Sequence, residues 1–98
     1  MDIIYKSKKL EKQCTDMRVT VKDYGKEMAA KITARIGEIK SADTVEELVK
    51  YRIGRCHPLE GNRHGQFAMD LVHPYRLVFV RNGESVELVK IISIENYH

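Results

Sequence analysis

The pattern of apolar and polar residues changes halfway along the chain. After a short alternating segment at residues 2–6, apolar residues of the first half recur every three or four positions, which is the spacing of a buried helix face. From Val21 to Ile39 this spacing is continuous and predicts one amphipathic helix of about 18 to 21 residues. Shorter helices are expected at residues 8–16 and 44–51, the latter begun by a capping box at Asp43 or at Thr44 and ended by Gly54.

The second half has the two-residue period of strands. Strands are expected at residues 67–72 and 75–80 around a His73-Pro74 turn, at 85–94 after an Asn82-Gly83 hairpin turn, and near 53–57. Helices followed by mostly consecutive antiparallel strands predict an α+β fold. We expect one compact domain over residues 1–98, with an N-terminal strand and helices packed on one face of a mainly antiparallel sheet.

Composition bears on the expected compartment of the protein and on whether a disulfide or a metal is expected. Of the 98 residues 43% are hydrophobic, but no apolar run approaches the roughly 20 residues that span a bilayer, and the first residues lack the apolar segment of a signal peptide. We therefore expect a cytoplasmic protein with no membrane partner. Cys14 and Cys56 form no CxxC pair and are expected to be free thiols. The histidines are irregularly spaced, so neither a metal nor another cofactor is expected.

The basic residues change type along the chain. Residues 1–50 contain nine lysines and two arginines, whereas residues 51–98 contain one lysine and five arginines. The planar guanidinium of arginine binds phosphate through two parallel hydrogen bonds, which the ammonium of lysine cannot do. Any polyanion is therefore expected to bind the second half, and above all the segment 52–76, which also holds three of the four histidines.

These residue types suit the cleavage of RNA without a metal. Such cleavage needs a base for the ribose 2′-OH, an acid for the departing 5′-oxygen, and cations for the charge that develops on phosphorus. Acid and base candidates, a stacking or proton-donating ring, and phosphate-binding arginines are all present: His57, Glu60, His98, Tyr97, Arg55, Arg63 and Arg76. Arg76 has a purely structural alternative, in which it pairs with Asp70 across a hairpin.

Three segments resemble one family in the same order. They are His57-Pro-Leu-Glu-Gly-Asn-Arg-His-Gly-Gln-Phe, Tyr75-Arg-Leu-Val-Phe and the terminal Asn96-Tyr97-His98, and they are similar to the HigB, or plasmid maintenance killer, branch of the RelE/ParE toxins. The resemblance implies a RelE-like fold and the toxin of a type II toxin–antitoxin system that cleaves mRNA on the 70S ribosome. It also implies a hetero-oligomer with an antitoxin that contains a helix-turn-helix domain.

The resemblance also assigns residues. It implies functional positions at His57, Arg76, Tyr97 and His98, and we add Glu60 as a catalytic candidate. Residues expected to contact RNA are Arg55, Arg63, His64 and Asn96.

Two positions depart from the family pattern: Glu60 stands where the pattern has lysine, and Asn96 where it has aspartate. Glu60 either acts as general base with His98 as acid, or it repels phosphate and weakens activity.

Two other functions remain open. ParE-like relatives share the architecture, bind DNA gyrase and lack the catalytic residues, whereas this chain has His57 and a terminal Tyr97-His98. The chain can also be a catalytically weak homologue that acts only as the binding partner of a DNA-binding antitoxin. The mRNA cleavage hypothesis differs from both because it predicts discrete new RNA ends.

Overall fold

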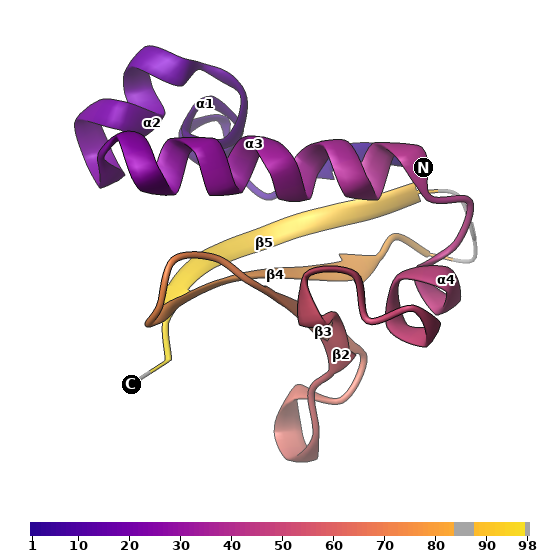
Figure 1. The fold of residues 1–98 in the computed structure, drawn as a ribbon. Helices are drawn as coiled ribbons and strands as arrows, with labels where there is room; N and C mark the ends of the chain where they lie inside the picture. Colours follow the sequence, from indigo (N-terminus) through magenta and orange to yellow (C-terminus); the bar gives the residue numbers. More distant parts are fainter. Residues whose placement is uncertain (84–87, 98) are drawn as a thin grey trace.

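The computed structural model describes residues 1–83 and 88–97 and shows a helical layer packed on a five-stranded sheet (Figure 1). The strand order is β1-β5-β4-β3-β2, in which β1 pairs in parallel with β5 and the other neighbours are antiparallel. The elements are α1 (Lys8–Thr15), α2 (Met17–Tyr24), α3 (Lys26–Ser41) and α4 (Val45–Lys50), with strands β1 (Asp2–Tyr5), β2 (His57–Pro58), β3 (Gln66–Asp70), β4 (Tyr75–Arg81) and β5 (Leu88–Asn96), and the short 3₁₀ turns η1 (Ile53–Arg55) and η2 (Gly61–Arg63).

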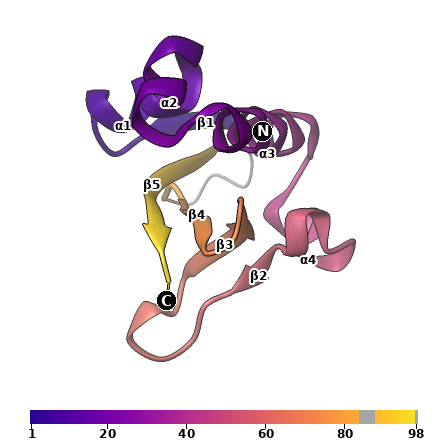
Figure 2. The ribbon, with the colours of Figure 1, turned by 60° about the vertical axis from the view of Figure 1, so that its left-hand side comes forward.

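The main core lies between the sheet and helices α1 to α3, which cover one of its faces (Figures 1 and 2). Ile32 and Ile39 of α3 and Leu77 and Phe79 of β4 are completely buried in it. The apolar residues at helical spacing and those at strand spacing therefore meet in one interface, which confirms the expected α+β arrangement. Within the described residues no helix is long and apolar enough to cross a bilayer.

The expected single helix from Val21 to Ile39 is wrong, because the chain breaks at Gly25 into α2 and α3. Gly25 has φ 89° and ψ 169°, a conformation that is essentially restricted to glycine. The apolar spacing continues across the break because Tyr24 at the end of α2 packs against the same core as Met28 and Ile32 of α3. Periodicity alone therefore could not reveal the turn.

The strands expected at residues 67–72 and 75–80 are present as β3 and β4. The prediction of a tight hairpin turn directly after β4 is wrong. A two-residue Asn82-Gly83 turn would place Arg81 opposite Glu84, whereas Arg81 pairs with Val89. The described part of the last strand runs from Leu88 to Asn96, two residues past the expected end at Ile94. Residues 84–87, which include the expected start of this strand, lie outside the described residues.

The strand expected near residues 53–57 is reduced to His57–Pro58. Arg52, Gly54 and Arg55 have φ values of 52°, 58° and 57°, which exclude an extended backbone. The preceding helix α4 ends at Lys50, within one residue of the expected range 44–51, but Tyr51 and not Gly54 is the residue that ends it. Its start is the Thr44 alternative, since the Thr44 hydroxyl accepts the Glu47 backbone N–H at 3.2 Å.

Candidate functional site

The sheet face turned away from α1 to α3 is open and carries a charged pair. Arg76 on β4 and Glu95 on β5 are cross-strand partners, and partners of this kind project from the same face. Two residues further along β4, Val78 packs with Ala68 and Leu59 in a small apolar cluster of its own. The loop that carries η2 lies beneath this face (Figure 2), and Ala68 and Val78 are completely buried, so this part of the face is covered and the charged pair lies beside it.

Glu95 is the centre of a hydrogen-bonded cluster on this face. Arg63 donates from Nη1 to Oε1 at 2.7 Å and from Nη2 to Oε2 at 3.1 Å, which is a two-pronged contact. Arg76 donates to Oε1 from Nε at 2.9 Å and pairs with it through Nη2 at 2.8 Å. Ser93, also on β5, donates its hydroxyl to Oε2 at 3.0 Å. Two guanidiniums from the η2 loop and β4 are thus brought together by one carboxylate.

This environment fixes the charge of Glu95. Its hydrogen bonds from Arg63, followed by those from Arg76 and Ser93, lower the pKa of the carboxyl to about 2, against an opposing effect of burial. The carboxylate is therefore ionised at neutral pH. Two guanidiniums and one carboxylate leave the cluster with a net charge of +1.

Tyr97 extends the cluster beyond the end of β5. The Arg76 guanidinium lies 5.0 Å from the centre of the Tyr97 ring, which is within the range of a cation–π contact. The backbone N–H of Tyr97 donates to the Pro74 carbonyl at 3.2 Å, and its ring meets the edge of His73. The Tyr97 side chain is nevertheless 43% exposed, so the ring has a surface on which a base can stack.

Asn96 is the last residue of β5 and pairs with Tyr75, so the strand holds the segment before Tyr97 in place. His98, an expected catalytic residue, lies outside the described residues.

His57 is exposed on β2, opposite Ala68, and shares the open face with it. Its Nδ1 lies 2.9 Å from the Arg55 carbonyl oxygen. Because a carbonyl only accepts, Nδ1 donates in this contact, and Nε2 is the ring nitrogen that does not face the Arg55 carbonyl. With strands about 4.8 Å apart, β2 lies about 10 Å from the strand that carries Arg76. His57 thus belongs to the same face but does not contact the Glu95 cluster.

Three other expected residues surround this face at its edge. Glu60 and His64 are exposed on either side of η2, so they share a loop with Arg63. Arg55 is 76% exposed and its Nε lies 3.4 Å from Asp70 Oδ2, away from Glu95. The structure therefore brings Arg63 and Arg76 together at Glu95, places Tyr97 against Arg76, and leaves His57, Glu60, His64 and Arg55 outside this cluster.

The carboxylate at the centre of the cluster was not among the expected residues. Arg76 is expected to bind phosphate or to pair with Asp70 across a hairpin; the two residues do lie opposite each other on β3 and β4, but the ion pair of Arg76 is with Glu95. One signal was available in the sequence: Glu95 is an acidic residue at the end of an apolar strand, directly before Asn96-Tyr97. The pairing itself depends on the strand register, which the sequence did not reveal.

The remaining reactive groups do not add to this site. Cys56 is only 3% exposed, and burial raises the pKa of its thiol to about 12, so it does not provide a nucleophile. Within residues 1–83 and 88–97, histidine, cysteine and acidic side chains form no group of three that can hold a metal ion.

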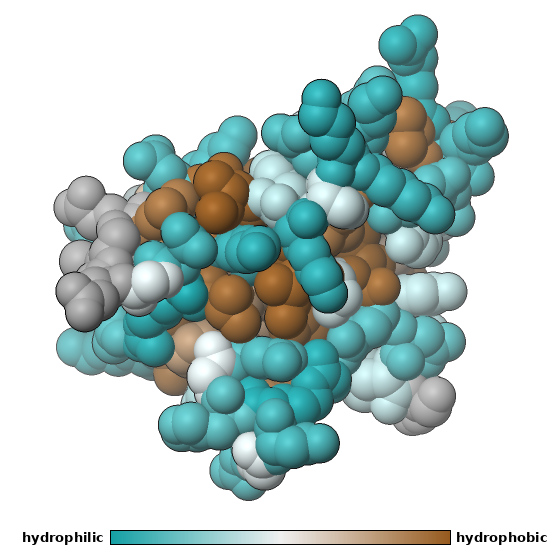
Figure 3. Space-filling model, turned by 180° about the vertical axis from the view of Figure 1, so that it is seen from behind, coloured by the Kyte–Doolittle hydropathy of each residue, from teal (hydrophilic) through white to brown (hydrophobic). Residues whose placement is uncertain are grey.

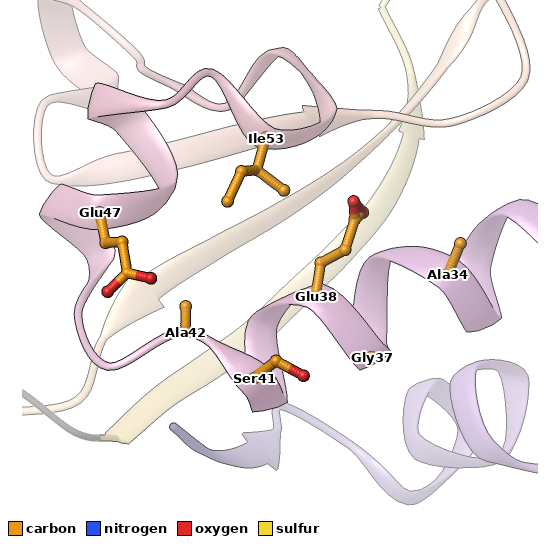
Figure 4. Close-up of a pocket in the computed structure, with 7 residues that line it drawn as sticks. All are labelled: Ala34, Gly37, Glu38, Ser41, Ala42, Glu47 and Ile53. Atoms are coloured by element: carbon orange, nitrogen blue, oxygen red, sulfur yellow. The ribbon is translucent and has the colours of Figure 1, made fainter.

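Two further surface features lie apart from the cluster. A groove of about 590 Å³ separates α3 from α4 and η1, and Figure 4 shows small residues on its α3 wall. Its lining is Ala34, Gly37, Glu38, Ser41, Ala42, Glu47 and Ile53. Seen from behind, the molecule shows apolar side chains gathered at the centre of a hydrophilic surround (Figure 3). None of the expected site residues lines the groove.

Neither a protein-family model nor a curated protein matches the chain, but solved structures do. A YoeB-YefM complex from Staphylococcus aureus aligns with a TM-score of 0.64 and 23% identity, over 100% of this chain and 97% of that one. A YoeB/ParE toxin from Agrobacterium tumefaciens aligns with a TM-score of 0.64 and 17% identity, over 100% of both chains. A YoeB dimer from Staphylococcus aureus gives a TM-score of 0.64 and 23% identity over 97% of its chain. At this identity the likeness concerns architecture, and the chain therefore has the α+β fold of YoeB and ParE-type toxins.

Proposed function

We propose that the chain is the toxin of a type II toxin–antitoxin system and acts as a HigB-like endoribonuclease of the RelE/ParE superfamily. The observation that carries the proposal is the gathering of Arg63 and Arg76 beside Tyr97 on the open face of the sheet. Solved structures with this fold are described as toxins or as a toxin–antitoxin complex. The three sequence motifs that resemble the HigB branch surround the same face.

The chemistry is an attack of the ribose 2′-oxygen on the adjacent phosphorus. Nε2 of His57 accepts the 2′-OH proton, the new O2′–P bond forms, and the P–O5′ bond breaks to leave a 2′,3′-cyclic phosphate. Arg76 and Arg63 stabilise the negative charge that develops on the phosphoryl oxygens. The Tyr97 ring stacks on a base and holds the nucleotide over Arg76.

The remaining roles rest on sequence. His98 returns a proton to the departing 5′-oxygen, and Asn96, Arg55 and His64 contact the RNA. Glu60 stands where the family pattern has lysine, and its exposed carboxylate beside η2 opposes the approach of phosphate. Since His57 is assigned as the base, we propose that Glu60 lowers activity and does not act as the base.

The implied partners are an antitoxin with a helix-turn-helix domain, the 70S ribosome and its mRNA, in the cytoplasm. A hetero-oligomer with the antitoxin is supported by the YoeB-YefM complex of the same fold. Neither a metal nor another cofactor takes part in the proposed reaction.

The test is to induce the chain in bacteria and to map mRNA 5′ ends within minutes. Discrete new ends within translated frames are expected, and Arg76→Gln should abolish them because it removes a charge from the reacting phosphate. Arg18→Gln is the matched control, since Arg18 is 94% exposed on α2 and should behave as the wild type. Glu60→Lys should increase cleavage, whereas a loss of cleavage would identify Glu60 as the general base.

The same experiment separates the alternatives. Altered DNA supercoiling without new RNA ends would favour a ParE-like gyrase inhibitor. Neither effect, in the wild type and in Glu60→Lys, would favour a binding partner of a DNA-binding antitoxin.

A further inference from the structure

We propose that Glu95 is an internal counter-anion of the phosphate-binding arginines, which RNA must displace in order to bind, so that Glu95 sets the affinity of the site for RNA. This inference rests on the proposed function, because it assumes that Arg63 and Arg76 contact an RNA phosphate. It adds a residue that is not among the site residues expected from the sequence.

The hydrogen bonds of the cluster already have the form of an anion site. Oε1 of Glu95 is contacted by Arg63 Nη1 and by Nε and Nη2 of Arg76, and Oε2 accepts from Arg63 Nη2 and Ser93 Oγ. A phosphodiester likewise has two charged oxygens that guanidinium groups can contact through paired hydrogen bonds. In the RNA-free protein the carboxylate therefore occupies the position in which the proposed reaction requires phosphate.

The cluster is arranged so that an external anion can compete. Arg63 and Glu95 have side chains that are 34% and 25% exposed, so phosphate can approach from the open face. Glu95 cannot leave with its backbone, because it pairs with Arg76 in the sheet, but its side chain can rotate. Arg63 lies on η2 between Gly61 and Gly65, and both glycines have positive φ. The competition is therefore between two anions for the same N–H donors and does not require the sheet to open.

The competition between Glu95 and an RNA phosphate should change how the affinity for RNA depends on salt concentration. Each phosphate contact made by a cation releases counterions and adds about 0.7 to the slope of log affinity against log salt concentration for a single strand. While Glu95 holds both guanidiniums, an RNA phosphate gains them only by losing that internal contact. Removal of the Glu95 charge should therefore strengthen RNA binding and make it more sensitive to salt.

The experiment measures binding of the purified chain to a fluorescent single-stranded RNA with 2′-O-methyl riboses, which lack the attacking hydroxyl and stay intact. Anisotropy titrations between about 50 and 200 mM salt compare the wild type with Glu95→Gln. We expect Glu95→Gln to bind on the order of tenfold more tightly at the lowest salt, with a steeper salt slope. Glu27→Gln is the matched control: it removes the same charge from an exposed position on α3 and should leave binding unchanged.

A second variant covers the case in which Glu95→Gln does not fold, which circular dichroism would reveal. Ser93→Ala removes the hydroxyl that holds Oε2 and keeps every charge, so it should strengthen binding by about twofold.

Weaker or unchanged binding in the folded variants would overturn the role of Glu95. If binding is unchanged while Arg76→Gln weakens it, the inference fails and the RNA-binding site stands. If Arg76→Gln and Arg63→Gln also change nothing, the proposed function fails with it.

Discussion

At the scale of single residues, the cluster around Glu95 joins stability to function. A carboxylate that accepts hydrogen bonds from Arg63, Arg76 and Ser93 holds the η2 loop, β4 and β5 together. A site that brings two positive charges together normally destabilises a fold. Here the Glu95 carboxylate lies between the two guanidiniums and offsets their repulsion. The same contact therefore stabilises the folded chain and restrains its proposed activity.

This contact predicts a specific response to acid. The pKa of Glu95 in the folded chain is about 2, below its ordinary value of 4.5, so its contribution to stability is complete above about pH 4.5 and is lost as the pH falls toward 2. Glu95→Gln lacks this titration. Urea unfolding at about pH 5 and about pH 3 should therefore show a smaller loss of unfolding free energy in Glu95→Gln than in the wild type.

Glu27→Gln removes a carboxylate from the exposed surface of α3 and should follow the wild type in these measurements. An equal acid response of Glu95→Gln and the wild type would contradict the role of the cluster in stability.

At the scale of elements, the break between α2 and α3 shows how a glycine redirects an amphipathic pattern without interrupting it. Gly25 lies directly after α2 and directly before α3. Its N–H donates to the Val21 carbonyl at 2.8 Å, and its carbonyl accepts from the Ala29 N–H at 3.0 Å. The space around its Cα is open, with no heavy atom within 4 Å of an added Cβ. Its requirement for glycine is therefore one of backbone conformation alone.

Two glycines of this region allow a matched comparison. Gly25→Ala should lower the unfolding free energy by about 1 to 3 kcal/mol, because φ 89° with ψ 169° is strained for any residue with a Cβ. Gly37→Ala should raise it by about 0.5 to 1 kcal/mol, because Gly37 lies inside α3 and an added Cβ also meets nothing within 4 Å. Chemical denaturation of both variants measures the two effects, and a stable Gly25→Ala would show that the break has another cause.

The elements also mark how far the sequence could predict the structure. The strands β3 and β4 were predictable because their large apolar residues recur at every second position, although Ala68 and Val78 on the other face are buried as well. The charged pair of the site was not, because the register decides it: counting outward from a two-residue Asn82-Gly83 turn places Val89 opposite Arg76, where the structure has Glu95. The sequence could thus supply Arg63, Arg76 and Tyr97 as residue types, but not the carboxylate that joins them.

At the scale of the whole molecule, β5 connects most of the parts described above. It pairs with β1 on one side and β4 on the other, contributes Val89 and Ile91 to the main core, and carries Ser93 and Glu95 on the opposite face. The scaffold and the site therefore share one strand. Activity and stability can still be separated at its end, because the pairings of β5 extend only to Asn96.

Deletion of residues 97–98 tests this separation. The sheet pairings are retained, and among the described backbone contacts the one between Tyr97 N–H and the Pro74 carbonyl is lost. Growth arrest should disappear, because the stacking ring and the proposed acid are removed, while the melting temperature should fall by less than about 5 °C. Growth assays with thermal unfolding of the same protein measure both, and retained toxicity would refute the role of these two residues.

The parallel pairing of β1 with β5 has a consequence for the order in which the molecule can form. Ile3 lies opposite Val89, so the strand that is synthesised first acquires this partner only after some eighty further residues have followed. Helices α1 to α3 can form locally before that, but β1 has to wait. The strand that finally receives it also brings Glu95 and Tyr97. Docking of the first strand and completion of the charged cluster therefore both require β5, and a partly synthesised chain that ends before residue 88 has neither.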